Sequence, residues 1–410
     1  MKHIRLLRCR SVRVLWLSMT LSVLGDRLYG LAAMWVVYEA TGSSSRTGLV
    51  AAVESLPYIA LGGAGYLMAR FSRWRSLAWL DAGRAAVALA VPLFWSPDTT
   101  GFLITLTLVL LLGTLSAVFD PNFGALVPQL VPVEELPLVS GLFDLTSRIA
   151  GVLGQGSVGV LLLLVSEIEL FAVDGCTFVV SALALGWLGR RTASPADGEP
   201  PTGPVRATAG VPARPLLRRH PRIAIAVAVH GVALFTAAVS TVGLPPMLVS
   251  RFGQGATGYG LALAATAAGG LAGNLLTGQL ADRPAATGSS AAGRSWISTY
   301  CLAWALSGCA LAGLGVADSM AVVIALCVLS GLLFPVCAVT LRAHLTRFAP
   351  AERLRLLTVD QTVTRSAGMA GLLLLPPVVD AAPAGAFVGA GVLLSAAGLA
   401  GWWLGGRKAP

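Results

Sequence analysis

Two apolar stretches of the sequence each carry an acid and then a base, about half a chain apart. The first pair is Asp144 and Arg148, and the second is Asp360 and Arg365, at offsets of 216 and 217 residues. An offset of this size indicates two copies of one large unit. In a membrane-embedded chain, parallel repeats typically enclose a site between them. Ionised groups placed there can bind protons, pair with one another, or close a gate.

A further acid and base, Asp26 and Arg27, lie near the middle of the first apolar run, and Glu54 lies in the second. A carboxylate at that depth can take up and release a proton, because desolvation disfavours its charged form. The alternative is a permanent ion pair in which Arg27 meets Glu54. Together with Arg148 and Arg365, these three residues are the predicted proton-coupling and substrate-cavity group.

The composition requires most of the surface to face lipid or other apolar helices. Of 410 residues, 12% are charged and 56% are hydrophobic, and the mean hydropathy is +0.78. Soluble proteins carry about 25% charged residues. The six cysteines include no CxxC spacing, so neither a metal site nor a disulfide framework is indicated. No phosphate-binding loop and no nucleophile–base pair is found, so we expect neither an enzyme nor a cofactor.

Twelve apolar runs have about the 20 residues that a membrane-spanning helix needs. Helices satisfy their backbone hydrogen bonds within lipid, so we expect an all-α integral membrane fold of two pseudo-symmetric six-helix bundles. The expected domains are residues 1–188, a cytoplasmic linker at 189–221, and residues 222–410. The twelve runs are 12–38, 47–69, 75–95, 101–119, 138–165, 169–188, 222–249, 257–281, 295–316, 319–341, 356–379 and 384–404.

The net charge of +10 follows from topology. With the N-terminus placed in the cytoplasm, 23 Lys and Arg residues fall on the inner side, and the outer side receives Arg46 and Arg251. Inner loops are enriched in Lys and Arg, so we expect a multi-pass protein of the cell membrane with both termini cytoplasmic. This distribution does not indicate nucleic-acid binding.

A second set of charged residues is expected to form a cytoplasmic gate that bridges helix ends. The alternative for its arginines is plain anchoring at the inner membrane face, which leaves the carboxylates of Asp81 and Asp282 unexplained. Two polar residues have simpler readings, since Asp174 is expected to reach the outer interface and His230 to be a packing residue. The gate set is Arg70, Arg73, Asp81, Arg84, Asp144, Asp282, Arg283 and Asp360.

Three segments resemble motifs of the major facilitator superfamily, most closely the branch of enterobactin exporters and macrolide-efflux transporters. Residues 65–75 resemble the family loop G-x-L-A-D-R-x-x-R-R, and residues 278–283 are its counterpart in the second half. Residues 151–159 resemble the fifth-helix motif G-x-x-x-G-P-x-x-G-G of exporters. Ala69 stands where the loop motif has aspartate, and Gln155 where the helix motif has proline.

The resemblance implies a secondary active transporter that works by alternating access. We expect export of an amphipathic small molecule, such as a drug, siderophore or natural product, in exchange for protons. The alternatives are a substrate-specific metabolite carrier, or a membrane protein that keeps the fold without transporting. The expected partners are the small-molecule substrate, protons and the lipid bilayer, with the protein a monomer.

Overall fold

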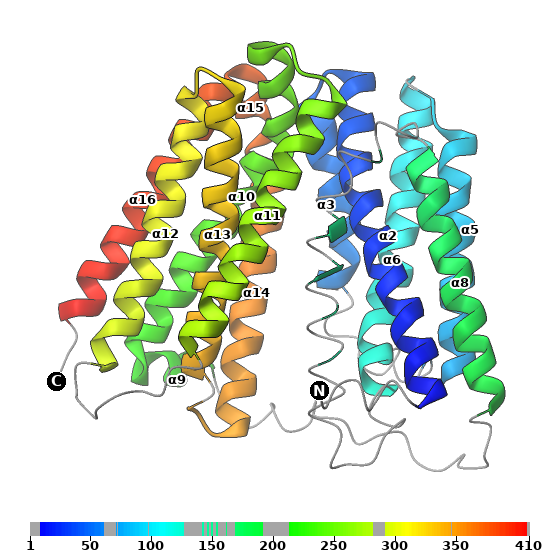
Figure 1. Ribbon diagram of the computed structural model, residues 1–410, viewed down its shortest axis with the longest axis horizontal. Coiled ribbons are helices and arrows are strands. Elements are labelled where there is room, and N and C mark those ends of the chain that lie inside the picture. Colours follow the sequence, from blue (N-terminus) through cyan, green and yellow to red (C-terminus); the bar gives the residue numbers. More distant parts are fainter. Residues whose placement is uncertain are drawn as a thin grey trace. The chain divides into compact units, whose positions relative to one another are not determined.

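The computed structural model contains α-helices and, in the parts of the chain that it describes, no strands (Figure 1). The described residues are 9–60, 71, 73–96, 98–126, 142, 146, 149–150, 153–154, 161, 169–191, 213–281, 292–345 and 347–407. The predicted fifth run, 138–165, therefore lies largely outside them.

The helices of the first half follow the apolar runs closely. Their cores are built from Leu, Val, Ala and Phe side chains, such as Leu77, Val109 and Phe178. Prolines inside α3 and α5, Pro57 and Pro92, do not end those helices. The described helices here are α2 (Arg10–Thr41), α3 (Ser44–Ala60), α5 (Trp74–Phe94), α6 (Thr99–Leu126) and α8 (Glu169–Arg191).

The second half has the same composition and one core cluster that includes Ile223, Tyr300 and Trp304. A short helix, α9, lies within the predicted linker region. The helices are α9 (Ala213–Arg219), α10 (Pro221–Phe252), α11 (Ala256–Ala281), α12 (Ala292–Val316), α13 (Met320–Leu345), α14 (Pro350–Leu374), α15 (Pro376–Ala381) and α16 (Pro383–Arg407).

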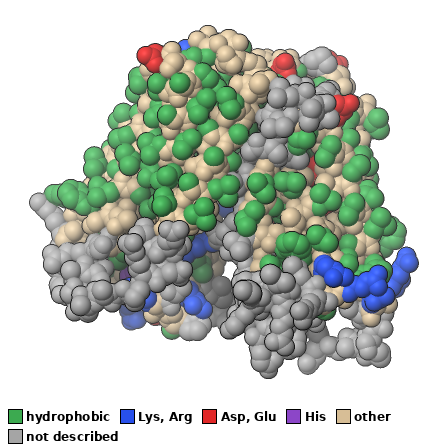
Figure 2. All heavy atoms as spheres, viewed as in Figure 1, with side chains coloured by type: hydrophobic (Ala, Val, Ile, Leu, Met, Phe, Trp, Pro, Cys, Tyr) green, Lys and Arg blue, Asp and Glu red, His purple; other side chains and the backbone are tan. Residues whose placement is uncertain are grey.

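Nine stretches among the described helices are long and apolar enough to cross a membrane. Figure 2 shows hydrophobic side chains covering the flanks of the helices, with Lys and Arg side chains gathered near helix ends. A lipid-facing flank must be apolar, and charged groups are tolerated where water is within reach. The chain is thus an all-α integral membrane protein.

Chain contacts divide the protein into two compact units. Unit 1 comprises Met1–Thr41 and Val50–Gly203, and unit 2 comprises Gly42–Leu49 and Pro204–Pro410. The boundary after Gly203 lies within the stretch predicted to be a linker, 189–221. The segment Gly42–Leu49 is the exception to a simple division, because it joins two helices of the first half but belongs to unit 2.

The eleventh apolar run was expected to be one helix, and the structure corrects this. It forms α14 and α15, which are separated at Leu375. Pro376 and Pro377 have no backbone N–H, so they cannot donate to the carbonyls of Leu372 and Leu373. The periodicity of the apolar residues continues across the break and therefore does not reveal it.

The first turn of α3 packs against the break between α14 and α15. The ideal Cβ position of Gly48 lies 2.5 Å from the Leu372 carbonyl oxygen and 2.5 Å from Pro376 Cγ, so only glycine fits there. Asp380 of α15 accepts hydrogen bonds from the backbone N–H groups of Ser44 at 2.7 Å and Ser45 at 3.1 Å. The Ser45 hydroxyl also donates to Asp380, at 2.7 Å. A carboxylate more than 330 residues away in sequence thus caps the N-terminus of α3.

Candidate functional site: a buried arginine among carboxylates

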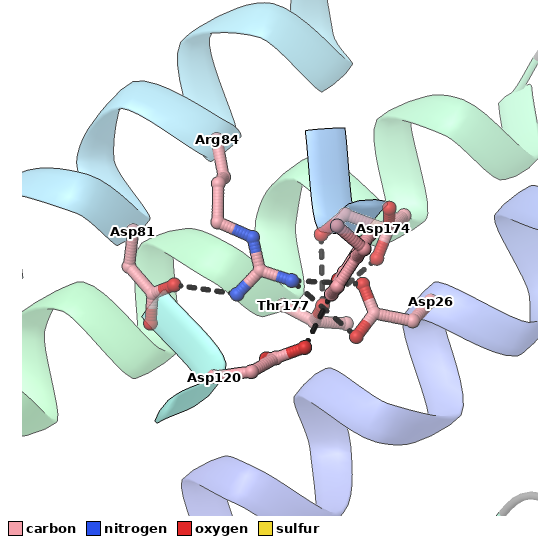
Figure 3. A network of polar contacts seen from close by, with 7 residues as sticks. Asp26, Asp81, Arg84, Asp120, Asp174 and Thr177 are labelled. Atoms are coloured by element: carbon pink, nitrogen blue, oxygen red, sulfur yellow. Dashed lines mark hydrogen bonds and ion pairs between the residues drawn. The ribbon is translucent and has the colours of Figure 1, made fainter. Parts of the chain in front are cut away.

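Arg84 lies in the interior of unit 1, within hydrogen-bond distance of two aspartates from different helices (Figure 3). Its Nη1 donates to Oδ1 of Asp81 at 2.9 Å, one turn earlier on α5. Its Nη2 donates to both carboxylate oxygens of Asp26 on α2, at 3.2 and 3.4 Å. The guanidinium therefore links α5 to α2 by charge-assisted hydrogen bonds.

Aromatic rings enclose the rest of the guanidinium. The Cζ atom of Arg84 lies 4.0 Å from the ring centroid of Phe178 on α8 and 5.0 Å from that of Phe119 on α6. A guanidinium stacks favourably on aromatic faces, and more strongly where water is excluded. The Arg84 side chain is 3% exposed, so these rings and the two aspartates surround it in place of water, although its Nε has no hydrogen-bond partner among the described residues.

Three more carboxyl groups lie near this centre. Asp174 on α8 is fully buried and accepts a hydrogen bond from the Thr177 hydroxyl at 3.3 Å. Asp120 at α6 accepts one from the Tyr58 hydroxyl at 2.9 Å. Glu54 is close enough to Asp174 for electrostatic interaction. We call Asp26, Glu54, Asp81, Arg84, Asp120 and Asp174 the unit 1 polar centre.

A close approach between α2 and α8 brings part of this centre together. A Cβ atom at Gly25 would lie 2.5 Å from Oδ1 of Asp174 and 2.6 Å from Oγ1 of Thr177. A side chain at position 25 would displace the Asp174 and Thr177 side chains, so Gly25 allows them to pack against α2 here. Asp26, the next residue, is thereby placed within reach of Arg84.

The charges in the unit 1 polar centre do not balance through Arg84. This guanidinium interacts electrostatically with Asp26, Asp81, Asp120 and Asp174, but it carries one positive charge. Asp81 and Asp174 are fully buried, and an ionised carboxylate in an apolar interior is costly unless it is paired. Across the described parts of the chain, no three His, Cys, Asp or Glu side chains form a metal-binding cluster.

The structure brings four predicted site residues together but regroups them. Asp26 and Glu54 were assigned to proton coupling, and Asp81 and Arg84 to the cytoplasmic gate. Both gate residues lie within α5, where Asp81 is fully buried. Arg84 of the predicted gate group pairs with Asp26 of the predicted proton-coupling group.

Other predicted residues lie at the edge of the described structure or outside it. Arg73 is exposed and immediately precedes α5. The residues that lie outside the described structure, in side chain or entirely, are Arg27, Arg70, Asp144, Arg148, Asp282 and Arg283. Asp174 does not reach the interface as expected, because it is fully buried.

In unit 2, the predicted gate residue Asp360 has a partner that the sequence reading assigned to packing. Its Oδ1 lies 2.8 Å from Nδ1 of His230. Arg365 is exposed on α14. The sequence signal for His230 was its place inside an apolar run, where a titratable side chain usually has a partner. Asp120 and Tyr58 of unit 1 were also not predicted as site residues.

The chain belongs to the Major Facilitator Superfamily, whose model matches residues 15–372. Solved structures agree with this fold. A bacterial homologue of the human lysosomal transporter Spinster, inward-facing and unoccupied, superposes with a TM-score of 0.69 at 14% identity, covering 98% of this chain and 97% of that one. A bacterial homologue of the iron transporter ferroportin, in an inward-facing state, superposes with a TM-score of 0.68 at 15% identity, covering 95% and 98%.

Another similar structure is a bacterial metal transporter, with a TM-score of 0.61 at 14% identity. No curated protein sequence matches this chain significantly. At these identities the likeness concerns the fold. The chain is thus a membrane transporter of the superfamily, a class that works by alternating access, with two helical bundles.

Proposed function

We propose that the protein is a secondary active transporter that exports an amphipathic small molecule in exchange for protons. The observation that carries this proposal is the ion pair between Asp26 and Arg84 in the interior of unit 1. The enterobactin-exporter and macrolide-efflux branch, which the sequence motifs resemble, supports the direction and substrate class.

The two partners of this ion pair differ in accessibility. The side chain of Asp26 is 41% exposed, whereas that of Arg84 is 3% exposed. A proton can therefore reach Asp26 without unpacking the core around Arg84. Protonation of Asp26 removes the charge that holds α2 against the guanidinium, while Asp81 keeps Arg84 in place on α5. Proton uptake is in this way linked to the contact between two helices, as an exchange mechanism requires.

The central experiment uses the purified full chain in liposomes, with ethidium as an amphipathic cationic probe. An acid interior of one pH unit drives about tenfold accumulation when one proton leaves for each cation that enters. We expect wild-type vesicles to accumulate ethidium to this extent. The variant Asp26→Asn should still exchange ethidium across the membrane but lose the pH-driven accumulation.

The matched control is Asp318→Asn, which removes an exposed carboxylate between α12 and α13 and should behave as wild type. Undiminished pH-driven accumulation by Asp26→Asn would show that Asp26 is structural. A substrate-specific metabolite carrier would ignore ethidium but be stabilised by one metabolite class in a thermal-shift screen. A protein that only keeps the fold would be stabilised by none.

A further inference from the structure

Unit 2 contains a titratable pair that the proposed exchange mechanism of unit 1 does not use. His230 on α10 and Asp360 on α14 come from adjacent packed helices, with His230 Nδ1 2.8 Å from Asp360 Oδ1. The two side chains are 18% and 13% exposed. His230 is the tenth residue of α10 and Asp360 the eleventh of α14, so each lies about 14 Å or more along its helix.

The groups around this pair are mainly aromatic and apolar. The imidazole ring lies 5.8 Å from the Trp304 ring on α12, and Trp304 contacts Tyr300 and Phe334 edge-on. Tyr300 donates its hydroxyl to the Ala226 carbonyl of α10. An ionised carboxylate in such surroundings is stabilised by an opposite charge beside it.

The helices around α10 differ in the titratable groups that they carry. α12 supplies Tyr300 and Cys301, and α13 supplies Cys337. On α14, Arg355 and Arg365 stand five residues before and after Asp360, which places each about 140° away around the helix. α11 and α16 carry no acid, base or histidine within their apolar lengths, α15 carries Asp380 at its far end, and α9 carries Arg214, Arg218 and Arg219.

We propose that His230 and Asp360 form a proton-binding site in unit 2, and that its occupancy sets the pH dependence of transport. An ionised carboxylate only accepts hydrogen bonds, so Nδ1 of His230 carries the hydrogen between them. Nε2 is then the atom that takes up the incoming proton, and the resulting imidazolium is stabilised by the Asp360 carboxylate. The link to transport rests on the proposed function, whereas proton binding does not.

The first arm of the test measures proton binding directly and needs no substrate. The purified full chain is labelled with ¹³C-histidine in nanodiscs, and the four histidines are titrated by NMR, with His230→Gln assigning the signal. We expect the His230 ring to bind a proton in this titration. Asp360→Asn should change that proton binding, because the carboxylate that stabilises the imidazolium is gone. Asp318→Asn should leave it unchanged.

The second arm measures ethidium flux in liposomes as a function of pH. In Asp360→Asn the pH profile should shift in the same direction as the His230 titration. The double variant His230→Asp with Asp360→His exchanges the two residues and keeps the pair. It should recover part of the wild-type pH profile. It also controls for misfolding.

The proposal is overturned if His230 does not titrate, or titrates equally with and without Asp360. It is also overturned if the titration moves but the flux profile does not, since the site would then bind a proton without coupling it. An absence of ethidium flux in the wild type counts against the proposed function instead, and the titration by itself then decides whether the pair binds a proton.

Discussion

The ring of His344, near the end of α13, lies flat against the ring of Trp296, with centroids 4.0 Å apart and planes 12° apart. Phe348 contacts it edge-on at 6.0 Å. Burial, reinforced by the positive charges of Arg347 and Arg222 and by His220, lowers the pKa of His344 from 6.5 to about 4. The folded protein therefore holds this histidine neutral at a pH where the unfolded chain would charge it.

This lowered pKa predicts a loss of stability in acid. Between pH 6.5 and about 4 the unfolded state binds more protons at His344 than the folded state, so stability falls as the pH falls through this window. Replacing the residue by phenylalanine keeps an aromatic ring against Trp296 and removes the titration. The melting temperatures of wild type and His344→Phe are compared at each pH. We expect the wild-type value to fall relative to that of the variant as the pH is lowered from 7 to 4.5. A difference that stays constant with pH would contradict a histidine that partial burial holds neutral.

At the scale of the helices, close contacts occur where a proline or a glycine permits them. The break before Pro376 leaves room at α14 and α15 for the first turn of α3, and Gly48 has no side chain to prevent the approach. Gly25 has the same role between α2 and α8. Each glycine lies near a carboxylate that forms hydrogen bonds to another helix, Asp380 in the first case and Asp26 in the second.

Capping of α3 by Asp380 predicts a measurable contribution to stability. The carboxylate accepts two backbone N–H bonds and one hydroxyl bond at the start of the helix. Loss of an N-terminal cap costs about 1 kcal/mol, so Asp380→Ala should lower the melting temperature in detergent, and Asp380→Asn should do so less. Amide hydrogen exchange should quicken at residues 44–49. Asp318→Asn is the control. If Asp380→Ala leaves amide exchange at residues 44–49 unchanged, Asp380 does not cap α3.

At the scale of the whole molecule, each unit has a polar pair that joins two of its helices. In unit 1 it is Asp26 with Arg84, and in unit 2 it is His230 with Asp360. The sequence repeat predicts two copies of one architecture, but the chemical groups of the two pairs differ.

The distribution of Lys and Arg predicts the orientation of the molecule. A green fluorescent protein fused after Pro410 should fluoresce, since we expect the C-terminus in the cytoplasm. Alkaline phosphatase fused after Asp318, between α12 and α13, should be active because that connection is expected outside. Active phosphatase at the C-terminus, or fluorescence from a fusion after Asp318, would reverse this orientation.

The membrane class, the helical fold and most helix positions could be predicted from the sequence. These features depend on local properties, namely the length and hydropathy of each run. The predicted run at 169–188 becomes α8 (Glu169–Arg191), and that at 257–281 becomes α11 (Ala256–Ala281). The family could also be recognised, because its loop motifs are short and contiguous. The split at Leu375 was not predicted, because the run was read from its length and hydropathy and not from the Pro376-Pro377 dipeptide.

The partners of the charged residues were decided by the tertiary structure. The sequence placed Asp26 beside Arg27, but the structure joins it to Arg84, 58 residues later. His230 meets Asp360 across 130 residues, and Asp380 caps Ser44 across 336. Successive residues on a helix point about 100° apart, so a partner is determined by how each helix is rotated and which helix it packs against. Composition and spacing place a charge within the membrane, and packing alone determines what it faces.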